Sequence, residues 1–179
     1  MTTTIGKAAG ARAERVRGTA AIATRLNALA SPTTHVLHNV PVGLGANVID
    51  HLVVGPQGVF AVTIRQHPGH HVLVDGYAMH VDGDYVPWLR AGKFQAERVA
   101  TLLRTQARID VPVRACVVLV TGFTSPSVTF RTRPLGASVL TKRDVPKWFR
   151  GQPTVLSQSE VTQIVWVARA TGIGSKTGE

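Results

Sequence analysis

Two runs of mostly β-branched residues joined by a short glycine-bounded turn constrain the fold more than any other feature of this chain. The runs are Val48–Val54 and Val59–Arg65, and the segment Gly55–Gly58 (Gly-Pro-Gln-Gly) separates them. Branched side chains favour extended backbone, and glycine allows the tight reversal that a hairpin needs. The sequence therefore predicts an antiparallel β-hairpin around which the other elements pack.

The spacing of apolar residues predicts the remaining elements. The expected helices cover residues 7–29, 88–108, 144–149 and 157–170. The expected strands outside the hairpin cover residues 35–40, 71–74, 77–81, 113–120, 128–130 and 137–140. This order predicts an α/β (α+β) fold in which helices flank one mixed β-sheet.

Two helices carry more specific signals. Phe94, Val99 and Leu102 or Leu103 are expected to supply the apolar face of the helix at 88–108. Ser157 precedes the last helix with a glutamate three residues later, which predicts a capping box at its N-terminus.

Composition bounds the class of protein. The chain has 179 residues, of which 44% are hydrophobic and 17% charged, as expected for one globular domain over residues 1–179. Cys116 is the single cysteine, which excludes an internal disulfide, and its apolar neighbours predict a buried thiol. No apolar run approaches the roughly 20 residues of a membrane span, and the first residues lack the apolar core of a signal peptide. We therefore expect a cytoplasmic protein without a membrane partner.

Positive charge is concentrated in the second half of the chain. The formal net charge is +10, and residues 91–179 carry thirteen bases and five acids against seven and five in residues 1–90. Such a surface attracts polyanions. The densest stretch also contains Trp148 and Phe149, and bases with aromatic residues are typical of surfaces that bind single-stranded nucleic acid. The candidate nucleic-acid contacts are Arg131, Arg133, Lys142, Arg143, Lys147 and Arg150. A plain charged surface with Trp148 anchoring a short helix is the alternative.

Asp50 is the one carboxylate in the expected hairpin. A carboxylate in an apolar strand needs a cation, a metal ion or a solvent-filled cleft. The alternation of side chains along a strand puts Thr63 and Arg65 on one face, and Asp50 is expected to share that face across the hairpin. The sequence leaves open an Asp50–Arg65 ion pair, an aspartate that caps a turn, and a functional site.

The fifteen residues 46–60 (Ala-Asn-Val-Ile-Asp-His-Leu-Val-Val-Gly-Pro-Gln-Gly-Val-Phe) resemble the nuclease-related domain, a bacterial family of the PD-(D/E)xK restriction-endonuclease-like superfamily. Leu37-His38-Asn39, Asp75-Gly76 and Phe94–Glu97 also fit its pattern. The resemblance implies a restriction-endonuclease-like mixed sheet and a nuclease-related core over about residues 14–120. A basic C-terminal extension (121–171) and a flexible tail (172–179) would follow this core.

Nucleases of this kind hold Mg²⁺ with an acid on the first strand and an acid-x-Lys motif on the second. By resemblance, Asp50 matches the first acid, and Gln95 matches a glutamine on the later helix. Thr63-Ile64-Arg65 stands where the acid-x-Lys motif is expected, and Gly18-Thr19 stands where the first helix reads Gly-Glu. The resemblance therefore implies a remnant site of Asp50, Thr63, Arg65 and Gln95 with a single carboxylate.

A remnant site of this kind predicts a protein that binds nucleic acid, DNA in the first place, without a cofactor and without cleaving it. One alternative is an active Mg²⁺-dependent DNA endonuclease, in which Asp50 is the metal ligand and Glu14, Glu97 or a second subunit supplies the missing acid. Another is a non-enzymatic interaction or scaffold module. The sequence also leaves a homodimer open.

The histidines give weaker signals. His67, His70 and His71 surround a Pro-Gly turn without a standard metal-ligand spacing, which favours a solvated loop over a metal site. His67 beside Asp50 and Arg65 is a further candidate for acid–base chemistry. His51 is expected on the opposite face of its strand from Asp50, as a hydrogen-bonded structural residue.

Overall fold

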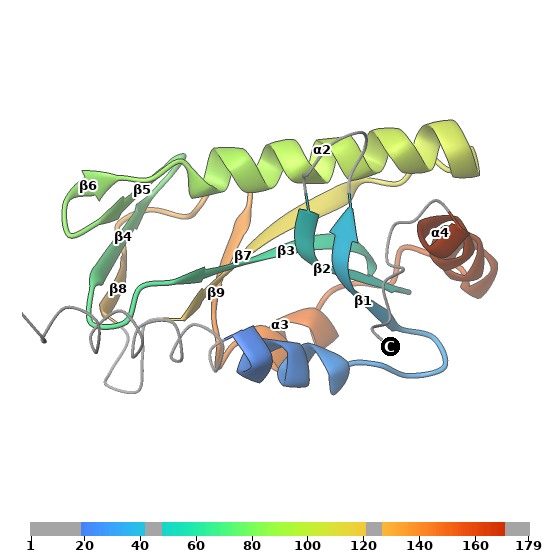
Figure 1. The fold of residues 1–179 in the computed structure, drawn as a ribbon, viewed down its shortest axis with the longest axis horizontal. Coiled ribbons are helices and arrows are strands. Elements are labelled where there is room, and N and C mark those ends of the chain that lie inside the picture. The colour runs from blue at the N-terminus through green and yellow to red at the C-terminus, as the bar shows by residue number, and fades with distance from the viewer. Residues whose placement is uncertain (1–18, 42–47, 121–126, 171–179) are drawn as a thin grey trace, which may run out of the picture.

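The computed structural model describes residues 19–41, 48–120 and 127–170 and contains two β-sheets, a five-stranded sheet between helices and a four-stranded sheet at one end of the molecule (Figure 1). The five-stranded sheet has the order β1 (His35–Pro41), β2 (Val48–Gly55), β3 (Gly58–Gln66), β7 (Val113–Val120), β9 (Ser138–Thr141). The pairs β1–β2 and β2–β3 are antiparallel, whereas β7 is parallel to both β3 and β9. The expected mixed sheet is therefore confirmed.

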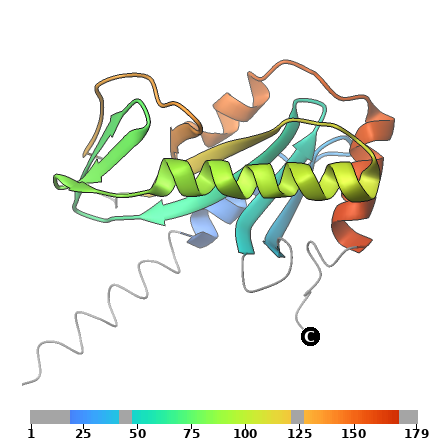
Figure 2. The same ribbon diagram turned by 90° about the horizontal axis from the view of Figure 1, so that it is seen from above.

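Helices cover both faces of this sheet. Seen from above, the long helix α2 (Trp88–Ala107) crosses the strands of the five-stranded sheet (Figure 2). The opposite face is covered by a helix over residues 19–27 and by α3 (Val145–Arg150). The last helix, α4 (Gln158–Ala170), packs against α2 and β2. The expected α/β (α+β) class, a mixed sheet flanked by helices, is confirmed.

The β2–β3 hairpin forms as the sequence predicts. Val54 pairs with Val59 and Gly55 with Gly58, so that two residues make the turn. Gly58 adopts a φ of +119°, which residues with a side chain rarely adopt. The hairpin therefore sets the register of the residues that follow it, including those around Asp50.

Apolar clusters lie on both faces of the sheet, which explains the continuous apolar run of β7. Val117 belongs to the cluster under α2, whereas Cys116 and Val118 belong to the cluster under the helix at 19–27 and α3. Burial raises the pKa of the Cys116 thiol to about 12. The predicted buried thiol is confirmed, and this pKa excludes a reactive thiolate near neutral pH.

The expectation of one sheet is wrong, because a second sheet is present. It has the order β6 (Asp84–Tyr85), β5 (Ala78–Val81), β4 (His71–Asp75), β8 (Ser127–Phe130). The β4–β5 hairpin around Asp75-Gly76 was expected, but β8 joins it in parallel from the distant C-terminal segment. Local patterns predict strands and tight turns, whereas this pairing depends on packing between segments far apart in the chain.

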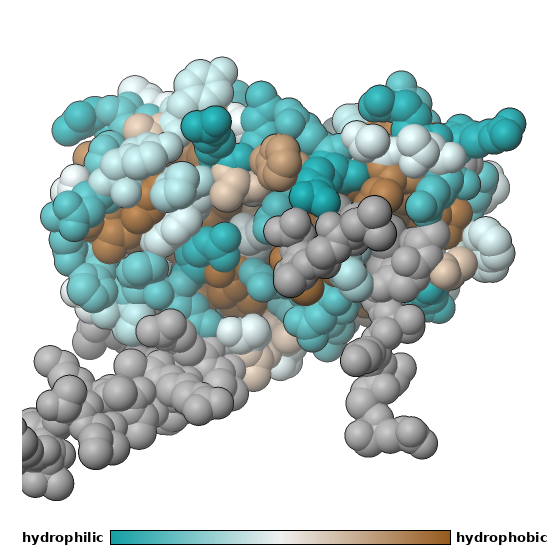
Figure 3. All heavy atoms as spheres, turned by 45° about the horizontal axis from the view of Figure 1, so that its top comes forward, coloured by the Kyte–Doolittle hydropathy of each residue, from teal (hydrophilic) through white to brown (hydrophobic). Residues whose placement is uncertain are grey.

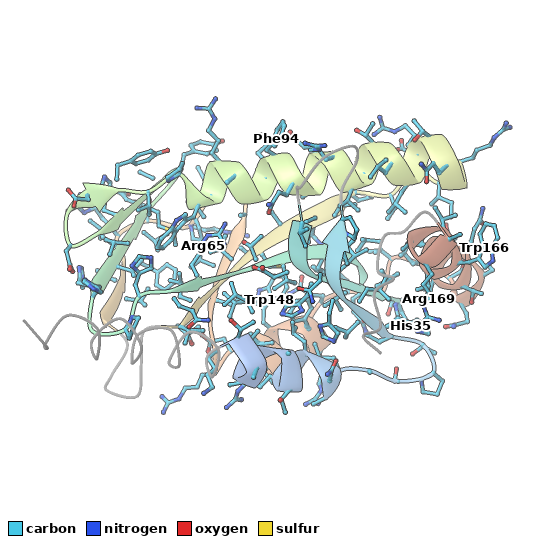
Figure 4. The ribbon with its side chains drawn as sticks, in the orientation of Figure 1. His35, Arg65, Phe94, Trp148, Trp166 and Arg169 are labelled. Atoms are coloured by element: carbon cyan, nitrogen blue, oxygen red, sulfur yellow. The ribbon has the colours of Figure 1, made fainter. Side chains whose placement is uncertain are left out.

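The helices correct one prediction and confirm another. Val99 and Leu103 are fully buried, but Phe94 is 58% exposed and lies on the outer side of α2 (Figure 4). Phe94 precedes Val99 by five residues, about 140° around the helix, so the two cannot share a face. At α4, the Ser157 N–H donates to Glu160 Oε2 (2.8 Å) and the Glu160 N–H to Ser157 Oγ (3.4 Å). The capping box is therefore confirmed.

Among the helices that the structure describes, none combines the length and apolar character that a membrane span requires.

Candidate functional site

Asp50 lies at the end of the β2–β3 ladder, half-buried between the strands. The regular pairing runs from the turn to His51 and Val62. Beyond it, the Ile64 N–H donates to Asp50 Oδ2 at 2.6 Å. One carboxylate oxygen of Asp50 thus satisfies the backbone of the neighbouring strand.

Alternation along β2 places Asp50 on the face that α2 covers. Leu52 and Val54, which follow Asp50 at intervals of two residues, belong to the same apolar cluster as Leu89 and Val99 of α2. Thr63 would lie opposite Asp50 if the antiparallel register continued one step beyond the His51–Val62 pair. The shared face of Asp50 and Thr63 therefore stays a prediction.

Helix α2 crosses the sheet at the level of Thr63. Thr63 pairs with Val117 of β7, and a Cβ added to Gly92 of α2 would lie 3.6 Å from the Val117 side chain. Gln95 follows Gly92 by about one helical turn. Two oxygen atoms here are buried without a hydrogen-bond partner among the described residues, namely Thr63 Oγ1 and Gln95 Oε1. Thr63 itself is only 2% exposed.

Arg65 does not pair with Asp50. Its Nη1 donates to the Ile64 carbonyl oxygen at 2.9 Å, so the guanidinium folds back on its own strand (Figure 4). Within the described segments, the ion pairs between side chains do not include one from Asp50 to Arg65. The ion pair that the sequence left open is therefore absent, because each group bonds to the backbone of Ile64 instead.

The residues around Asp50 do not fit a Mg²⁺ ion. Mg²⁺ is usually held by one or two carboxylates together with phosphate oxygens of the substrate. Here one oxygen of the single carboxylate already accepts the Ile64 N–H, Thr63 and Gln95 offer neutral oxygens, and Arg65 brings a charge of the same sign as the metal. In the part of the chain that the structure describes, no three His, Cys, Asp or Glu side chains could together hold a metal ion.

Glu97, one proposed source of a second acid, lies away from Asp50. Glu97 pairs with Lys93 (3.7 Å) and borders a cavity beside β7 and β9, toward the opposite edge of the sheet from β2. Glu14, the other candidate, lies outside the described residues.

His51 occupies the face opposite Asp50, where it is 4% exposed. Its Nδ1 lies 2.7 Å from His38 Nδ1, and His38 Nε2 lies 2.9 Å from Asn27 Oδ1. Burial, and secondarily the charge of His38, lower the pKa of His51 to about 4. His51 is therefore a neutral, hydrogen-bonded residue that links β2 to β1, as predicted.

The predicted histidine cluster, His67, His70 and His71, belongs to the connection between β3 and β4 and to the start of β4. The His67 ring packs against Trp88 with the ring centres 4.7 Å apart. His70 Nδ1 lies 2.5 Å from Asp82 Oδ2, and His71 Nε2 lies 3.0 Å from Thr129 Oγ1. These contacts fix the segment between β3 and β4.

The predicted nucleic-acid contacts divide into two groups. Arg131 and Arg133 lie after β8, on the side of the second sheet, where Arg131 pairs with Asp75 at 3.3 Å. The others lie at or near α3, on the opposite face of the five-stranded sheet from α2: Lys142, Arg143, Lys147 and Arg150. The structure therefore offers two basic surfaces where the sequence suggested one.

Trp148 anchors α3. Its ring packs edge-on against Phe60 and Phe149, with ring centres 5.6 and 5.0 Å apart, and lies below the sheet next to α3 (Figure 4). Phe149 is itself buried. The bases of α3 are thus presented by a packed helix. Trp166 of α4, by contrast, is 68% exposed.

Lys93 is a basic residue that the sequence did not indicate as a candidate contact. Lys93 of α2 and Arg133 border the same cavity of about 610 Å³ beside β9. Forty residues separate them, and helical spacing alone does not reveal that the loop after β8 returns to α2.

Exposed hydrophilic side chains cover most of the α2 side of the molecule, with separate hydrophobic patches between them (Figure 3).

A family model matches this chain. The family model described as the nuclease-related domain matches residues 9–120, more than half of the chain. No curated protein and no solved structure matches. The matched segment contains Asp50, Thr63, Arg65 and Gln95 and ends with β7.

Proposed function

Because the chain belongs to the nuclease-related domain family, we propose that it binds nucleic acid, DNA in the first place, without metal-dependent cleavage. The observation that carries this proposal is the donor set around Asp50. A single carboxylate, with one oxygen bonded to the Ile64 N–H, stands beside Thr63 where a second acid would be needed.

The electrostatics of the site support the loss of cleavage. Metal-dependent phosphodiester hydrolysis needs a cation that both activates water and binds the phosphate. A lysine at this position could orient water. Arg65 instead presents a planar guanidinium with a different donor geometry, which donates to the Ile64 carbonyl oxygen. We therefore propose that Asp50, Thr63, Arg65 and Gln95 are the remnant of a catalytic site.

The charge distribution supports binding. A formal net charge of +10 favours release of condensed counterions when the protein meets a phosphate backbone. Lys147 and Arg150 are exposed on α3, a helix held in place by the buried Phe149. A rigid basic helix can contact phosphates without an ordering cost, so we assign the principal backbone contacts to this surface.

Titration of fluorescent duplex DNA, single-stranded DNA and RNA with the full chain, in EDTA and at several salt concentrations, tests binding. We expect binding to weaken as the salt concentration rises. The variant Lys147→Gln/Arg150→Gln should make the negative slope of log K against log salt shallower by about 2. The matched control, Arg104→Gln/Arg169→Gln, also removes two charges but lies on α2 and α4, and should leave the slope nearly unchanged. Equal effects of both variants would show that binding depends on the net charge and not on the α3 surface.

Incubation of the same nucleic acids with Mg²⁺ or Mn²⁺ tests cleavage, and we expect none. One observation favours the alternative of an active nuclease: Thr63 Oγ1 and Gln95 Oε1 are buried oxygens without a partner in the described residues. Divalent-dependent cleavage that Asp50→Ala abolishes would establish that alternative. Neither binding nor cleavage, together with a defined oligomer in light scattering, would support an interaction module.

A further inference from the structure

A cavity of about 610 Å³ opens at the β9 edge of the five-stranded sheet, away from Asp50. It exists because β9 is short. Ser138, the first residue of β9, pairs with Cys116, so the preceding residues Val113–Ala115 of β7 have no partner in β9. The segment 133–137 and helix α2 close the space beside them.

The lining of this cavity is positively charged. Lys93, Arg114 and Arg133 border it, against the single carboxylate of Glu97. Arg114 is committed to the fold, because it donates to the Gln57 carbonyl oxygen (2.5 Å) and to Gln152 Oε1 (2.8 Å). Its guanidinium therefore adds positive charge to the lining without being free to bind a ligand.

Two cations remain available to a ligand. Lys93 faces Glu97 at 3.7 Å in an exposed pair within one helix, a contact that is weak in water. The Arg133 guanidinium makes no hydrogen bond or ion pair with any residue in the described ranges. An anionic group in the cavity can therefore bind both side chains.

An exposed aromatic ring stands at the rim. Tyr77 is 71% exposed, and a Cβ added to Gly136 would lie 3.9 Å from its ring carbons and 3.5 Å from Lys93 Cδ. The ring and the lysine stem thus flank Gly136, which borders the cavity. The Leu135 N–H donates to the Gly76 carbonyl oxygen (2.9 Å), which ties this loop to the turn that carries Tyr77.

We propose that this cavity binds an unpaired nucleotide, with its base stacked on Tyr77 and its phosphate held by Lys93 and Arg133. An aromatic ring beside cations is the arrangement that binds single-stranded nucleic acid, and the volume lies in the range of small-ligand sites. A duplex keeps its bases inside the stack, so a single strand or a strand end fits this geometry better. The proposal rests on the proposed function and narrows its substrate class to unpaired nucleic acid.

Binding of a fluorescent single strand and of its duplex in EDTA tests the proposal. We expect Tyr77→Ala to weaken single-strand binding about tenfold, as loss of one stacked base does, and to change duplex binding less than twofold. Lys93→Gln/Arg133→Gln should weaken single-strand binding by a similar factor. The matched control Tyr85→Ala removes another exposed tyrosine, 57% exposed, whose ring lies beside His80 with the ring centres 6.0 Å apart, whereas Tyr77 lies beside Gly136 of the cavity lining. This control should have no effect.

Unchanged single-strand binding in Tyr77→Ala, or an equal loss in Tyr85→Ala, would overturn the nucleotide site while the proposed function stands. No binding of any nucleic acid by the wild-type chain would overturn both. As a second readout, adenosine monophosphate should perturb the NMR signals of Gly136 and the Tyr77 ring, and a glutamate-rich peptide should not. The reverse result would assign the cavity to an acidic protein segment and refute the proposal.

Discussion

Acidification should destabilise this protein through His51. The bond between the two Nδ1 atoms of His38 and His51 needs a proton on one nitrogen and a lone pair on the other. His38 Nε2 faces the side-chain amide oxygen of Asn27, so we infer that it carries the proton of His38. The Nδ1 of His38 then accepts, and the Nδ1 of His51 donates. Its Nε2 is buried without a partner among the described residues, so a proton added there has nothing to bond.

The magnitude follows from the pKa of His51, which burial lowers from 6.5 to about 4. The folded state binds the proton less tightly than the unfolded state. The contribution of His51 to the free energy of unfolding is therefore fully present above pH 6.5 and is lost as the pH drops toward 4. One pKa unit corresponds to about 1.4 kcal/mol, which gives a loss of roughly 2 kcal/mol at pH 5 and about 3 kcal/mol below pH 4.

Urea unfolding at several pH values between 7.5 and 4 measures this loss. The control is His51→Asn, because carboxylates also titrate in this range in both proteins. We expect the wild type to lose about 2 kcal/mol more than the variant between pH 7 and pH 5. A second control, His35→Asn, removes a half-exposed histidine of the same β1–β2 pair and should leave the wild-type pH dependence intact. Parallel curves for the wild type and His51→Asn would refute the reasoning.

Three further predictions concern single residues. Thr63→Val removes a buried hydroxyl without a partner among the described residues and should leave the free energy of unfolding in urea unchanged or raise it. A decrease in that free energy of more than about 1 kcal/mol would reveal a hydrogen bond to the hydroxyl. Ser157→Ala removes the cap of α4 and should cost about 1 kcal/mol in urea unfolding, with no change expected in the affinity for nucleic acid. Cys116 should not react with a thiol reagent in the native state and should react fully in urea, because burial raises its pKa to about 12; rapid native labelling would contradict its burial.

The sequence predicted what depends on neighbouring residues in the chain. The glycine-bounded turn determines the register of β2 and β3, from the Gly55–Gly58 pair to the His51–Val62 pair. Ser157 and Glu160 form their capping box because the motif is complete within four residues. The remnant site of Asp50, Thr63, Arg65 and Gln95 was proposed from the family resemblance, not from these local patterns.

Features that depend on contacts between distant segments could not be predicted. The pairing of β4 with β8 creates a second sheet, and it joins residues more than fifty positions apart. Arg65 was a plausible partner for Asp50 by alternation alone, but the backbone of Ile64 binds both side chains. The cavity between Lys93 and Arg133 requires the end of β9 and a returning loop, neither of which leaves a periodic signal.

The absence of a cation site at Asp50 is the central claim, and a Mn²⁺ titration followed by electron paramagnetic resonance tests it most directly. The full chain and its Asp50→Asn variant would be compared at neutral pH, so that a second acid from any part of the chain could contribute. We expect the two proteins to show the same weak, unsaturated binding. A saturable Mn²⁺ site of one ion per chain that disappears in Asp50→Asn would contradict the account.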